Sequence, residues 1–375
     1  MSEHETTEDT NPLDPLVGKT LAGRFVLKRL LSRGGMGKVY LATQKPLDRE
    51  VALKVLDVMD DKGEFRRRFF MEASLCAKLR HPHTVRVYDY GATDDGIFFM
   101  VMEYLEGQSL HQMLRSEAPI DPLRAMTIAR RVCAALAEAH DSGIIHRDLK
   151  PANIFLVHHG DDPEYPKVID FGLVKELGKE SELSRTGHVL GSPLYMSPEQ
   201  VQGHDVDVRT DVYSIGSILY YALTGQTAVK RGNPMMVLMA QVKREAPAFA
   251  EVCPDRTFPP VIEWTVRTAL QKSPDERFAT MRQLVRALQV CERVLAGELP
   301  ESVALDLADG CVVLPPGIDF GEDITRPPGY VQRRSSLPPP TPLPGASPMP
   351  TDPTLAPSGV QSAVAELGPA ESTRT

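Results

Sequence analysis

The sequence predicts an α+β fold, in which a small β-rich part near the N-terminus is followed by a larger helical part. Three observations lead to this prediction. Short runs of alternating or β-branched residues, broken by Gly and Pro, occupy most of residues 24–105. One amphipathic helical pattern interrupts them, and after residue 108 apolar residues recur mainly with helical spacing. Sheet and helices are therefore largely segregated along the chain.

The composition divides the chain into three regions. Residues 1–23 are charged and Thr-rich, and we expect a disordered lead-in. Residues 24–293 carry regular apolar periodicity and should fold, with the β-rich part at about 24–104 and the helical part at about 105–293. Residues 294–375 are dense in Pro, Gly and Ser, with few large apolar residues to bury. We expect a disordered tail there.

Each expected element has its own signal. The helix at 64–80 places Phe65, Phe69, Ala73 and Cys76 on roughly one face. The helix at 121–143 begins with an Asp-Pro start signal and closes on Gly. The strands expected from short alternating runs are 24–32, 37–45, 50–57, 85–93 and 97–105.

Charge and cysteine content exclude several classes of protein. A net charge of -8 argues against non-specific nucleic-acid binding, which needs a basic face. The five cysteines are odd in number and form no C-x-x-C pair, which fits neither a disulfide framework nor a zinc cluster. The polar N-terminus does not resemble a signal peptide, and no run of about 18 apolar residues predicts a membrane span. We therefore expect a soluble, cytoplasmic protein.

The stretch "LLSRGGMGKVYLA", residues 30–42, is the first candidate site. Gly34, Gly35 and Gly37 would let backbone N–H groups approach phosphates, yet Ser32 stands where such loops usually begin with Gly. Taken alone, the stretch could be a nucleotide loop or a simple hairpin turn.

Three further motifs follow the glycine-rich stretch. "VALK" places Lys54 inside a strand pattern, where a buried amine is costly unless a charged partner or ligand meets it. Glu72, in the middle of the expected helix, could be that partner, and a purely structural ion pair is the alternative. "HRDLKPAN", residues 146–153, and "DFG", residues 170–172, come next.

The four motifs, in this order and over residues from about 24 to 290, resemble the signature set of the protein kinase family. The resemblance implies a bilobal kinase fold, ATP with Mg²⁺ (or Mn²⁺) as cofactors, and transfer of phosphate to protein substrates. The "DLKPAN" sequence is similar to the corresponding motif of Ser/Thr kinases. The sequences "GGMGKVY" and "YMSPEQ" are similar to the corresponding motifs of bacterial, Hanks-type members of the family.

The resemblance also implies roles for individual residues. Lys54 would hold the α- and β-phosphates and be oriented by Glu72. Asp148 would accept or orient the proton of the substrate hydroxyl, and Lys150 would add positive charge beside it. Two oxygen-bearing side chains, Asn153 and Asp170, would bind the metal ion. The remaining nucleotide-binding positions would be Leu31, Ser32, Arg33, Gly34, Gly35, Met36, Gly37, Lys38, Val39, Ala52, Met102, Glu103, Leu105 and Phe155.

The residues after "DFG" resemble an activation segment. Glu199 would pair with Arg277, and Asp211 would brace the catalytic loop. Arg147, just before Asp148, implies regulation by a phosphorylated residue. The candidates are Ser184, Thr186 and Ser192, of which mid-segment Thr186 is favoured; phosphorylation in trans would need a transient homodimer.

The tail allows two interpretations. It is either an unstructured spacer or a segment with a function. Ser335 and Ser336 follow two arginines, which would suit autophosphorylation, and the adjacent proline run could dock a partner.

Three smaller features have simpler explanations. "HPH", residues 81–83, and His158-His159 supply too few ligands for a tetrahedral metal site, and we expect a turn and a surface loop. Residues 66–68, three arginines, should be a solvated helix face, with contact to an activation-loop phosphate as the alternative.

Two other functions compete with an active kinase. A pseudokinase scaffold would bind nucleotide and partners without transfer, but Lys54, Glu72, Asp148, Asn153 and Asp170 are all present. A small-molecule phosphotransferase of related fold would typically lack the Pro-Glu segment and "DLKPAN". Both are therefore less favoured.

Overall fold

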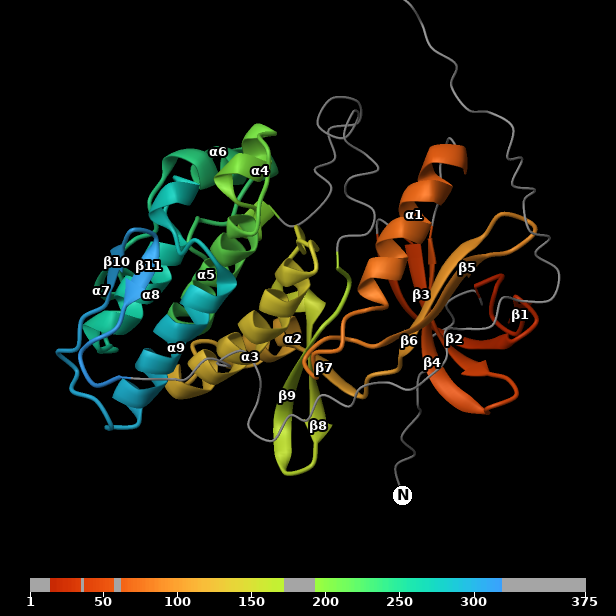
Figure 1. Cartoon of the computed structure of the whole chain (residues 1–375), viewed down its shortest axis with the longest axis horizontal. Helices are drawn as coiled ribbons and strands as arrows, with labels where there is room; N and C mark the ends of the chain where they lie inside the picture. The colour runs from red at the N-terminus through yellow and green to blue at the C-terminus, as the bar shows by residue number, and fades with distance from the viewer. Residues whose placement is uncertain (1–13, 35–36, 57–61, 172–192, 319–375) are drawn as a thin grey trace, which may run out of the picture. The chain divides into compact units, whose positions relative to one another are not determined.

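The computed structural model describes four ranges of the chain, residues 14–34, 37–56, 62–171 and 193–318. Within these ranges a β-sheet with one helix comes first and a mainly helical part follows (Figure 1). The predicted α+β order is therefore confirmed.

In the described part of the N-terminal region, six strands form one antiparallel sheet in the order β1-β2-β3-β4-β6-β5. The five longer strands match the five predicted from alternating runs. The strands are β1 (Thr20–Leu21), β2 (Phe25–Gly34), β3 (Gly37–Gln44), β4 (Arg49–Leu56), β5 (Val87–Ala92) and β6 (Phe98–Glu103).

The sheet is apolar on both faces. Along β4, Ala52 and Leu56 belong to one buried cluster, whereas Val51, Leu53 and Val55 belong to another. This alternation follows from the two-residue period of a strand. We call the side with Ala52 and Leu56 the inner face and the opposite side the outer face.

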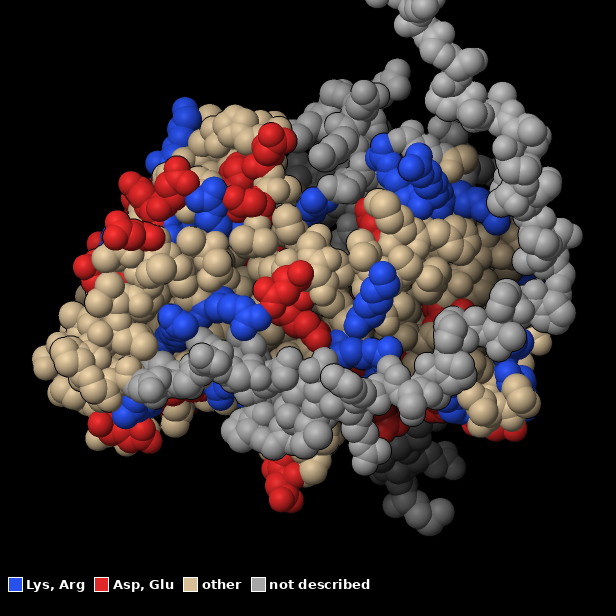
Figure 2. All heavy atoms as spheres, in the orientation of Figure 1, with Lys and Arg blue, Asp and Glu red and all other residues tan. Residues whose placement is uncertain are grey.

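Helix α1 (Lys62–Cys76) covers the inner face, as its apolar stripe predicts. The rings of Phe65 and Phe69 lie 5.0 and 5.4 Å from the ring of Phe98 of β6, centroid to centroid. On the solvent side of α1, Arg66 and Arg67 are exposed, and Figure 2 shows basic side chains gathered over this helix. The prediction of a solvated basic face is confirmed for these two arginines, whereas Arg68 is half-buried.

The second part of the chain is built on helices. Helix α3 begins after Asp121, whose side chain accepts a hydrogen bond from Arg124 N, and it ends just before Gly143, which has a φ of 75°. The helices are α2 (Leu110–Glu117), α3 (Pro122–Asp141), α4 (Pro198–Gln202), α5 (Arg209–Thr224), α6 (Pro234–Lys243), α7 (Phe249–Val252), α8 (Pro260–Ala269) and α9 (Met281–Leu295). No helix within the described ranges has both the length and the hydropathy needed to cross a bilayer.

A small sheet not predicted from the sequence lies beside these helices. It consists of β7 (Gly107–Ser109), β8 (Ile154–His159) and β9 (Asp162–Val168), in that order. Strands β8 and β9 carry the chain from the "HRDLKPAN" motif to the "DFG" motif. The sheet therefore fixes the spacing between the two motifs.

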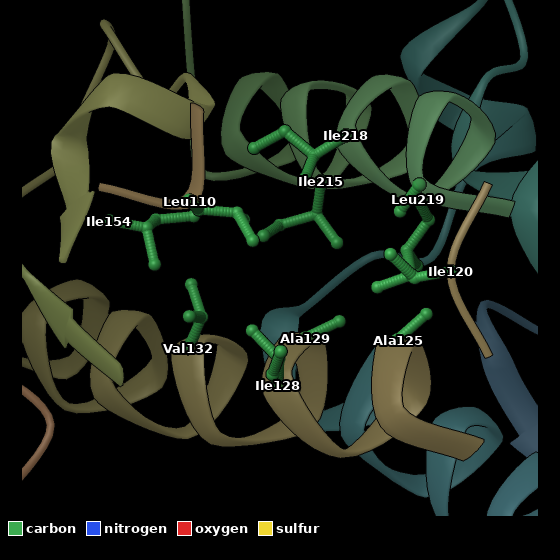
Figure 3. A pocket seen from close by; sticks show the side chains of 11 residues that line it. Leu110, Ile120, Ala125, Ile128, Ala129, Val132, Ile154, Ile215, Ile218 and Leu219 are labelled. Atoms are coloured by element: carbon green, nitrogen blue, oxygen red, sulfur yellow. The ribbon is translucent and has the colours of Figure 1, made fainter. Parts of the chain in front are cut away.

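Aliphatic side chains fill the space between α3 and α5. Figure 3 shows them pointing toward one another from both helices, joined by one residue from α2, one from β8 and Ile120, which precedes α3. The residues that line this part of the core are Leu110, Ile120, Ala125, Ile128, Ala129, Val132, Ile154, Ile215, Ile218, Leu219 and Ala222. Ile154 directly follows Asn153, so this core supports the loop that carries the "HRDLKPAN" motif.

The N-terminal boundary differs from the prediction. Residues 14–23 belong to the fold, since Thr20–Leu21 pairs with β2 and Leu21 is buried on the outer face. Gly18 N donates to Leu27 O at 2.8 Å, and Leu27 N donates to Lys19 O at 2.9 Å. The prediction failed because the charged residues 1–13 dominate the composition of 1–23 and hide the apolar Leu16, Val17 and Leu21, which pack on the outer face.

The C-terminal boundary also differs. Strands β10 (Asp306–Ala308) and β11 (Cys311–Val313) form a hairpin, and Leu305 and Val312 are buried in the main core. These isolated apolar residues alternate with exposed ones, so a composition averaged over the Pro-rich region hid them. Residues 319–375 of the predicted tail, including Ser335 and Ser336, lie outside the described residues.

The packing of β11 allows a direct test. Val312→Ala removes two methyl groups from a side chain that is 5% exposed, and it should lower the free energy of unfolding by about 2 kcal/mol. Val313→Ala on the same strand, at 48% exposed, should change it by less than about 0.5 kcal/mol. Urea unfolding of both variants gives the comparison, and equal values would mean that the hairpin does not belong to the core.

Candidate active site

The glycine-rich stretch forms the hairpin between β2 and β3. Gly34 and Gly37 are cross-strand partners next to its tip, and the strand register shifts between Leu30 and Ser32. Gly37 has a φ of 138°, and a Cβ there would lie 2.0 Å from the Val55 carbonyl oxygen. Only glycine fits this position. Gly35 and Met36, at the tip itself, lie outside the described residues.

Lys54 and Asp170 meet although 116 positions separate them. Lys54 lies on β4 opposite Val39, and its Nζ donates to Asp170 Oδ1 at 2.8 Å. Burial alone would raise the pKa of Asp170, but the Lys54 ammonium outweighs it and the pKa is lowered. Asp170 is therefore held as a carboxylate. Glu72 is half-buried on α1, and its pairing with Lys54 stays a prediction.

The loop between α3 and β8 presents Asp148. Lys150 Nζ donates to Asp148 Oδ2 at 2.8 Å, and Asn153 Nδ2 donates to the Asp148 carbonyl oxygen at 2.8 Å. A short 3₁₀ turn, Pro151–Asn153, brings Asn153 back toward Asp148. The three side chains predicted in this loop are thus brought together.

Asp211, in the first turn of α5, holds the loop from below. Its buried carboxylate accepts hydrogen bonds from His146 N at 2.8 Å and Arg147 N at 2.9 Å. His140 Nε2 lies 2.8 Å from the same carboxylate. Burial alone would raise the pKa of Asp211, but His140 and the backbone donors lower it. The predicted brace is confirmed, whereas the contribution of His140 was not predicted.

The residues predicted around a purine lie on the inner face of the sheet. Ala52 and Met102 are buried side by side as cross-strand partners, and Leu31, Val39 and Leu105 pack half-buried against the same cluster. This surface is apolar, as the binding of a flat heterocycle requires.

Phe155 and Glu103 are linked through β9. Phe155 of β8 pairs in register with Lys167 of β9, and Lys167 Nζ donates to Glu103 Oε1 at 2.8 Å. The Lys167–Glu103 ion pair anchors the end of β6 to the strand that leads to Asp170. The sequence carried no signal for it, because the two residues lie in unrelated motifs.

A small hollow lies beside Asp148. Gln200 of α4 closes one side of it by donating from Nε2 to the Arg147 carbonyl oxygen at 2.7 Å. The residues that line it are Arg147, Asp148, Leu149, Lys150, Tyr195, Met196, Gln200 and Ser214. Tyr195, Met196 and Ser214 were not predicted as site residues. Their side chains help to close the hollow beside Asp148.

The donor set fits a hard divalent cation. Asp170 offers a carboxylate and Asn153 an amide oxygen, which are ligand types that Mg²⁺ accepts. Within the described ranges, no group of three or more His, Cys, Asp or Glu side chains could hold a metal ion. A cation at Asn153 and Asp170 would therefore share its coordination with phosphate and water, as Mg²⁺ commonly does.

His83 of the "HPH" turn has a structural role. Its side chain is buried, with Nδ1 2.8 Å from the Pro166 carbonyl oxygen and the ring 4.2 Å from that of Tyr165, centroid to centroid. Burial lowers the pKa of His83 to about 3, so the ring is neutral near pH 7.

Glu199 and Arg277 form a buried ion pair, as predicted. Arg277 Nη1 and Nη2 donate to Glu199 Oε1 and Oε2, each at 2.8 Å. Both side chains are almost fully buried, and Thr210 Oγ1 also donates to Glu199 at 2.7 Å. The pair ties α4 to the segment before α9.

The candidate phosphorylation sites Ser184, Thr186 and Ser192 lie outside the described residues. The structure resumes at Pro193, in a short 3₁₀ turn that ends at Tyr195. Tyr195 O accepts from Ser214 Oγ at 2.9 Å, so the end of the segment is fixed on α5.

Comparison with known proteins agrees with this geometry. The model of the protein kinase domain family matches residues 25–290. Serine/threonine-protein kinase pkn3 of Myxococcus xanthus is 38% identical over 292 residues, which are 76% of this chain and 53% of pkn3. Serine/threonine-protein kinase PknB of Mycolicibacterium smegmatis is 37% identical over 330 residues, 84% of this chain and 51% of PknB. The chain thus spans about half the length of these two relatives.

A solved structure is also similar to this chain. The crystal structure of the PknI kinase domain of Mycobacterium tuberculosis is 29% identical, with a TM-score of 0.57, and the match covers 75% of this chain and 98% of that chain. Fold and site together define a protein kinase domain. The chain belongs to the Hanks-type serine/threonine protein kinase family, and the relatives named above are bacterial.

The Glu199–Arg277 pair predicts a dependence of stability on pH. Burial would raise the pKa of Glu199, but Arg277 lowers it to about 2, below the usual value of 4.5. The stabilisation is therefore complete above about pH 4.5 and is lost as the pH falls toward 2. Glu199→Gln should lower the free energy of unfolding by about 3 kcal/mol at pH 7, because it leaves Arg277 buried without its counter-charge.

Urea unfolding at pH 7 and pH 3.5 measures this effect. The difference in free energy of unfolding between wild type and Glu199→Gln should be about 1.4 kcal/mol smaller at pH 3.5 than at pH 7. Glu298→Gln is the matched control, since Glu298 also pairs with an arginine but is 59% exposed. It should change stability by less than about 1 kcal/mol. A difference that does not vary with pH would contradict the argument.

Proposed function

We propose that this chain is an active serine/threonine protein kinase, which transfers the γ-phosphoryl group of ATP to Ser and Thr hydroxyls of protein substrates. One observation carries the proposal: the convergence of Lys54 from the sheet with Asp170 from the helical part. Asp148 and Asn153 lie hydrogen-bonded to each other in the adjacent loop. Membership in the family supports the same conclusion.

The nucleotide would lie under the hairpin of β2 and β3. Its purine would pack between Val39 and Ala52 on one side and Phe155 on the other. The backbone of Glu103 and Leu105 would offer hydrogen bonds at the edge. Lys54, with Glu72 as its second partner, would bind the α- and β-phosphates; its side chain is 13% exposed, so its charge acts with little screening.

The transfer itself needs few groups. The hydroxyl oxygen of the substrate forms a bond to the γ-phosphorus while the bond to the β-phosphate oxygen breaks, and ADP is released. Asp148 would accept the hydroxyl proton and later release it to solvent. Lys150, held 2.8 Å from Asp148, would place positive charge beside the transferred group.

Asn153 and Asp170 would hold Mg²⁺, with Mn²⁺ as an alternative. The ion would neutralise part of the phosphate charge during transfer. The ion pair with Lys54 keeps Asp170 ionised, which suits a metal ligand.

Regulation by autophosphorylation belongs to the same proposal. Arg147 precedes Asp148, and its backbone N–H is fixed on Asp211, so a phosphate bound by Arg147 would act on the catalytic loop directly. Thr186 would be the principal acceptor, with Ser184, Ser192, Ser335 and Ser336 as others, and transfer in trans would use a transient homodimer. Partner docking on the tail and cytoplasmic localisation stay predictions.

Asp148→Asn tests the proposed chemistry. It keeps the shape of the side chain but removes the proton acceptor, so phosphate transfer should fall at least about 100-fold. The affinity for ADP should change by less than about threefold, because Asp148 does not bind nucleotide. Mass spectrometry after incubation with Mg-ATP locates the phosphate, and titration calorimetry measures ADP binding.

Asp95→Asn, in the exposed turn between β5 and β6, is the matched control and should leave both quantities unchanged. Phosphate on Thr186 or on the tail in wild type, absent in Asp148→Asn, is the expected result. Wild type that binds nucleotide but transfers no phosphate to itself or to a generic protein substrate would identify a scaffold instead.

Ser32 should have only a modest influence on ATP binding. It lies exposed on β2 opposite Val39, and it is not among the described residues with a positive φ, so its position does not demand glycine. Ser32→Gly should change KM for ATP by less than about tenfold, or about 1.4 kcal/mol. Steady-state kinetics with varied ATP give this value. A change from no turnover to robust turnover would contradict it.

A further inference from the structure

Asp14 is buried, although it lies upstream of the residues that match the kinase family. Its side chain is 1% exposed, and it precedes β1 in a segment that the sequence predicted to be disordered. A carboxylate is buried at a cost unless charged or hydrogen-bonding partners meet it. Its partners therefore indicate what it does.

The partners of Asp14 lie on the glycine-rich hairpin. Its Oδ2 lies 3.0 Å from Arg33 Nη2 and 3.0 Å from Lys38 Nζ. Its Oδ1 accepts from Tyr40 OH at 2.7 Å and from Leu16 N at 3.2 Å. One carboxylate thus binds both strands of the hairpin.

Arg33 and Lys38 need a counter-charge at this point. They are cross-strand partners, one step from the Gly34–Gly37 pair next to the tip. Like charges directly opposite each other in a sheet are destabilising. Asp14 compensates this repulsion, because its carboxylate pairs with both cations and so links the two strands.

The bridge acts from the face opposite the nucleotide. Tyr40 belongs to the buried cluster of the outer face, whereas Val39 packs on the inner face with Ala52. Asp14 therefore does not reach the phosphates, and the side chain of Lys38 turns away from them. Asp14 can act on the nucleotide only by positioning the hairpin.

The segment that carries Asp14 is itself fixed. Val17 N donates to Asp14 O at 2.8 Å, and Gly18 N donates to Leu27 O on β2 at 2.8 Å. Leu16 and Val17 pack against the outer cluster. Asp14 is thus attached to the same sheet whose hairpin it holds.

We propose that Asp14 is a positioning residue, which fixes the β2–β3 hairpin over the phosphates and so sets the affinity for adenine nucleotide. The inference rests on the proposed function, since it assigns Asp14 a role toward the same nucleotide. Without the carboxylate, the like charges of Arg33 and Lys38 separate the strands, and the Gly34–Gly37 pair next to the tip loses its fixed position.

Asp14→Asn is the variant that tests the inference. It keeps the size of the side chain and removes its charge. The KM for ATP and the Kd for Mg-ADP should both rise about five- to tenfold, while kcat changes less than about twofold, because the catalytic loop is untouched. Amide hydrogen exchange of residues 37–40, without nucleotide, should become faster.

Two controls separate positioning from general stability. Glu50→Gln removes the partner of Lys28 from the same sheet, in an exposed pair away from the tip, and should leave KM, Kd and exchange unchanged. In the Arg33→Gln/Lys38→Gln background, adding Asp14→Asn should change the Kd by less than about twofold, because no cations remain to be bridged.

The outcomes distinguish this inference from the proposed function. Wild type that transfers no phosphate overturns the proposed function, while the exchange and ADP measurements still report on Asp14. A lower melting temperature for Asp14→Asn, with unchanged Kd, KM and exchange at residues 37–40, overturns the positioning role. An equal loss of affinity in Glu50→Gln overturns it as well.

Discussion

The buried carboxylate of Asp211 is the interaction on which the site depends. It accepts two consecutive backbone N–H groups, those of His146 and Arg147, and so fixes the direction in which the chain enters Asp148. A loop of this length would otherwise have many conformations. Because Asp211 belongs to the core helix α5, the position of Asp148 follows from the packing of that helix against α3.

The N-terminal sheet is constrained in a different way, because it is a single layer that is apolar on both faces. The inner face carries Lys54 and the apolar residues proposed to hold the purine, and α1 packs against this face. The outer face is covered partly by residues 14–21, which bring Asp14 to the hairpin. The glycines of the hairpin thus join two strands that are held in place by charged and apolar contacts on the outer face of the sheet.

Much of the fold and site could be predicted because the signals are local. The alternation in β2, β3 and β4, the cap at Asp121 and the order of the motifs are all written in short stretches. The Glu199–Arg277 pair and the Asp211 brace came from the family resemblance. By contrast, Asp14, Lys167 and the β10–β11 hairpin depend on partners far away in the chain. An isolated Asp or Val in a polar region carries no sign of the partner that will bury it.

The Lys167–Glu103 ion pair has a mechanical consequence. Glu103 ends β6, and Lys167 lies three residues before Asp170. The two side chains are only 21% and 15% exposed, so water screens their attraction weakly. The pair therefore couples the end of β6 mechanically to the segment that leads into Asp170, so that a displacement of one carries the other with it.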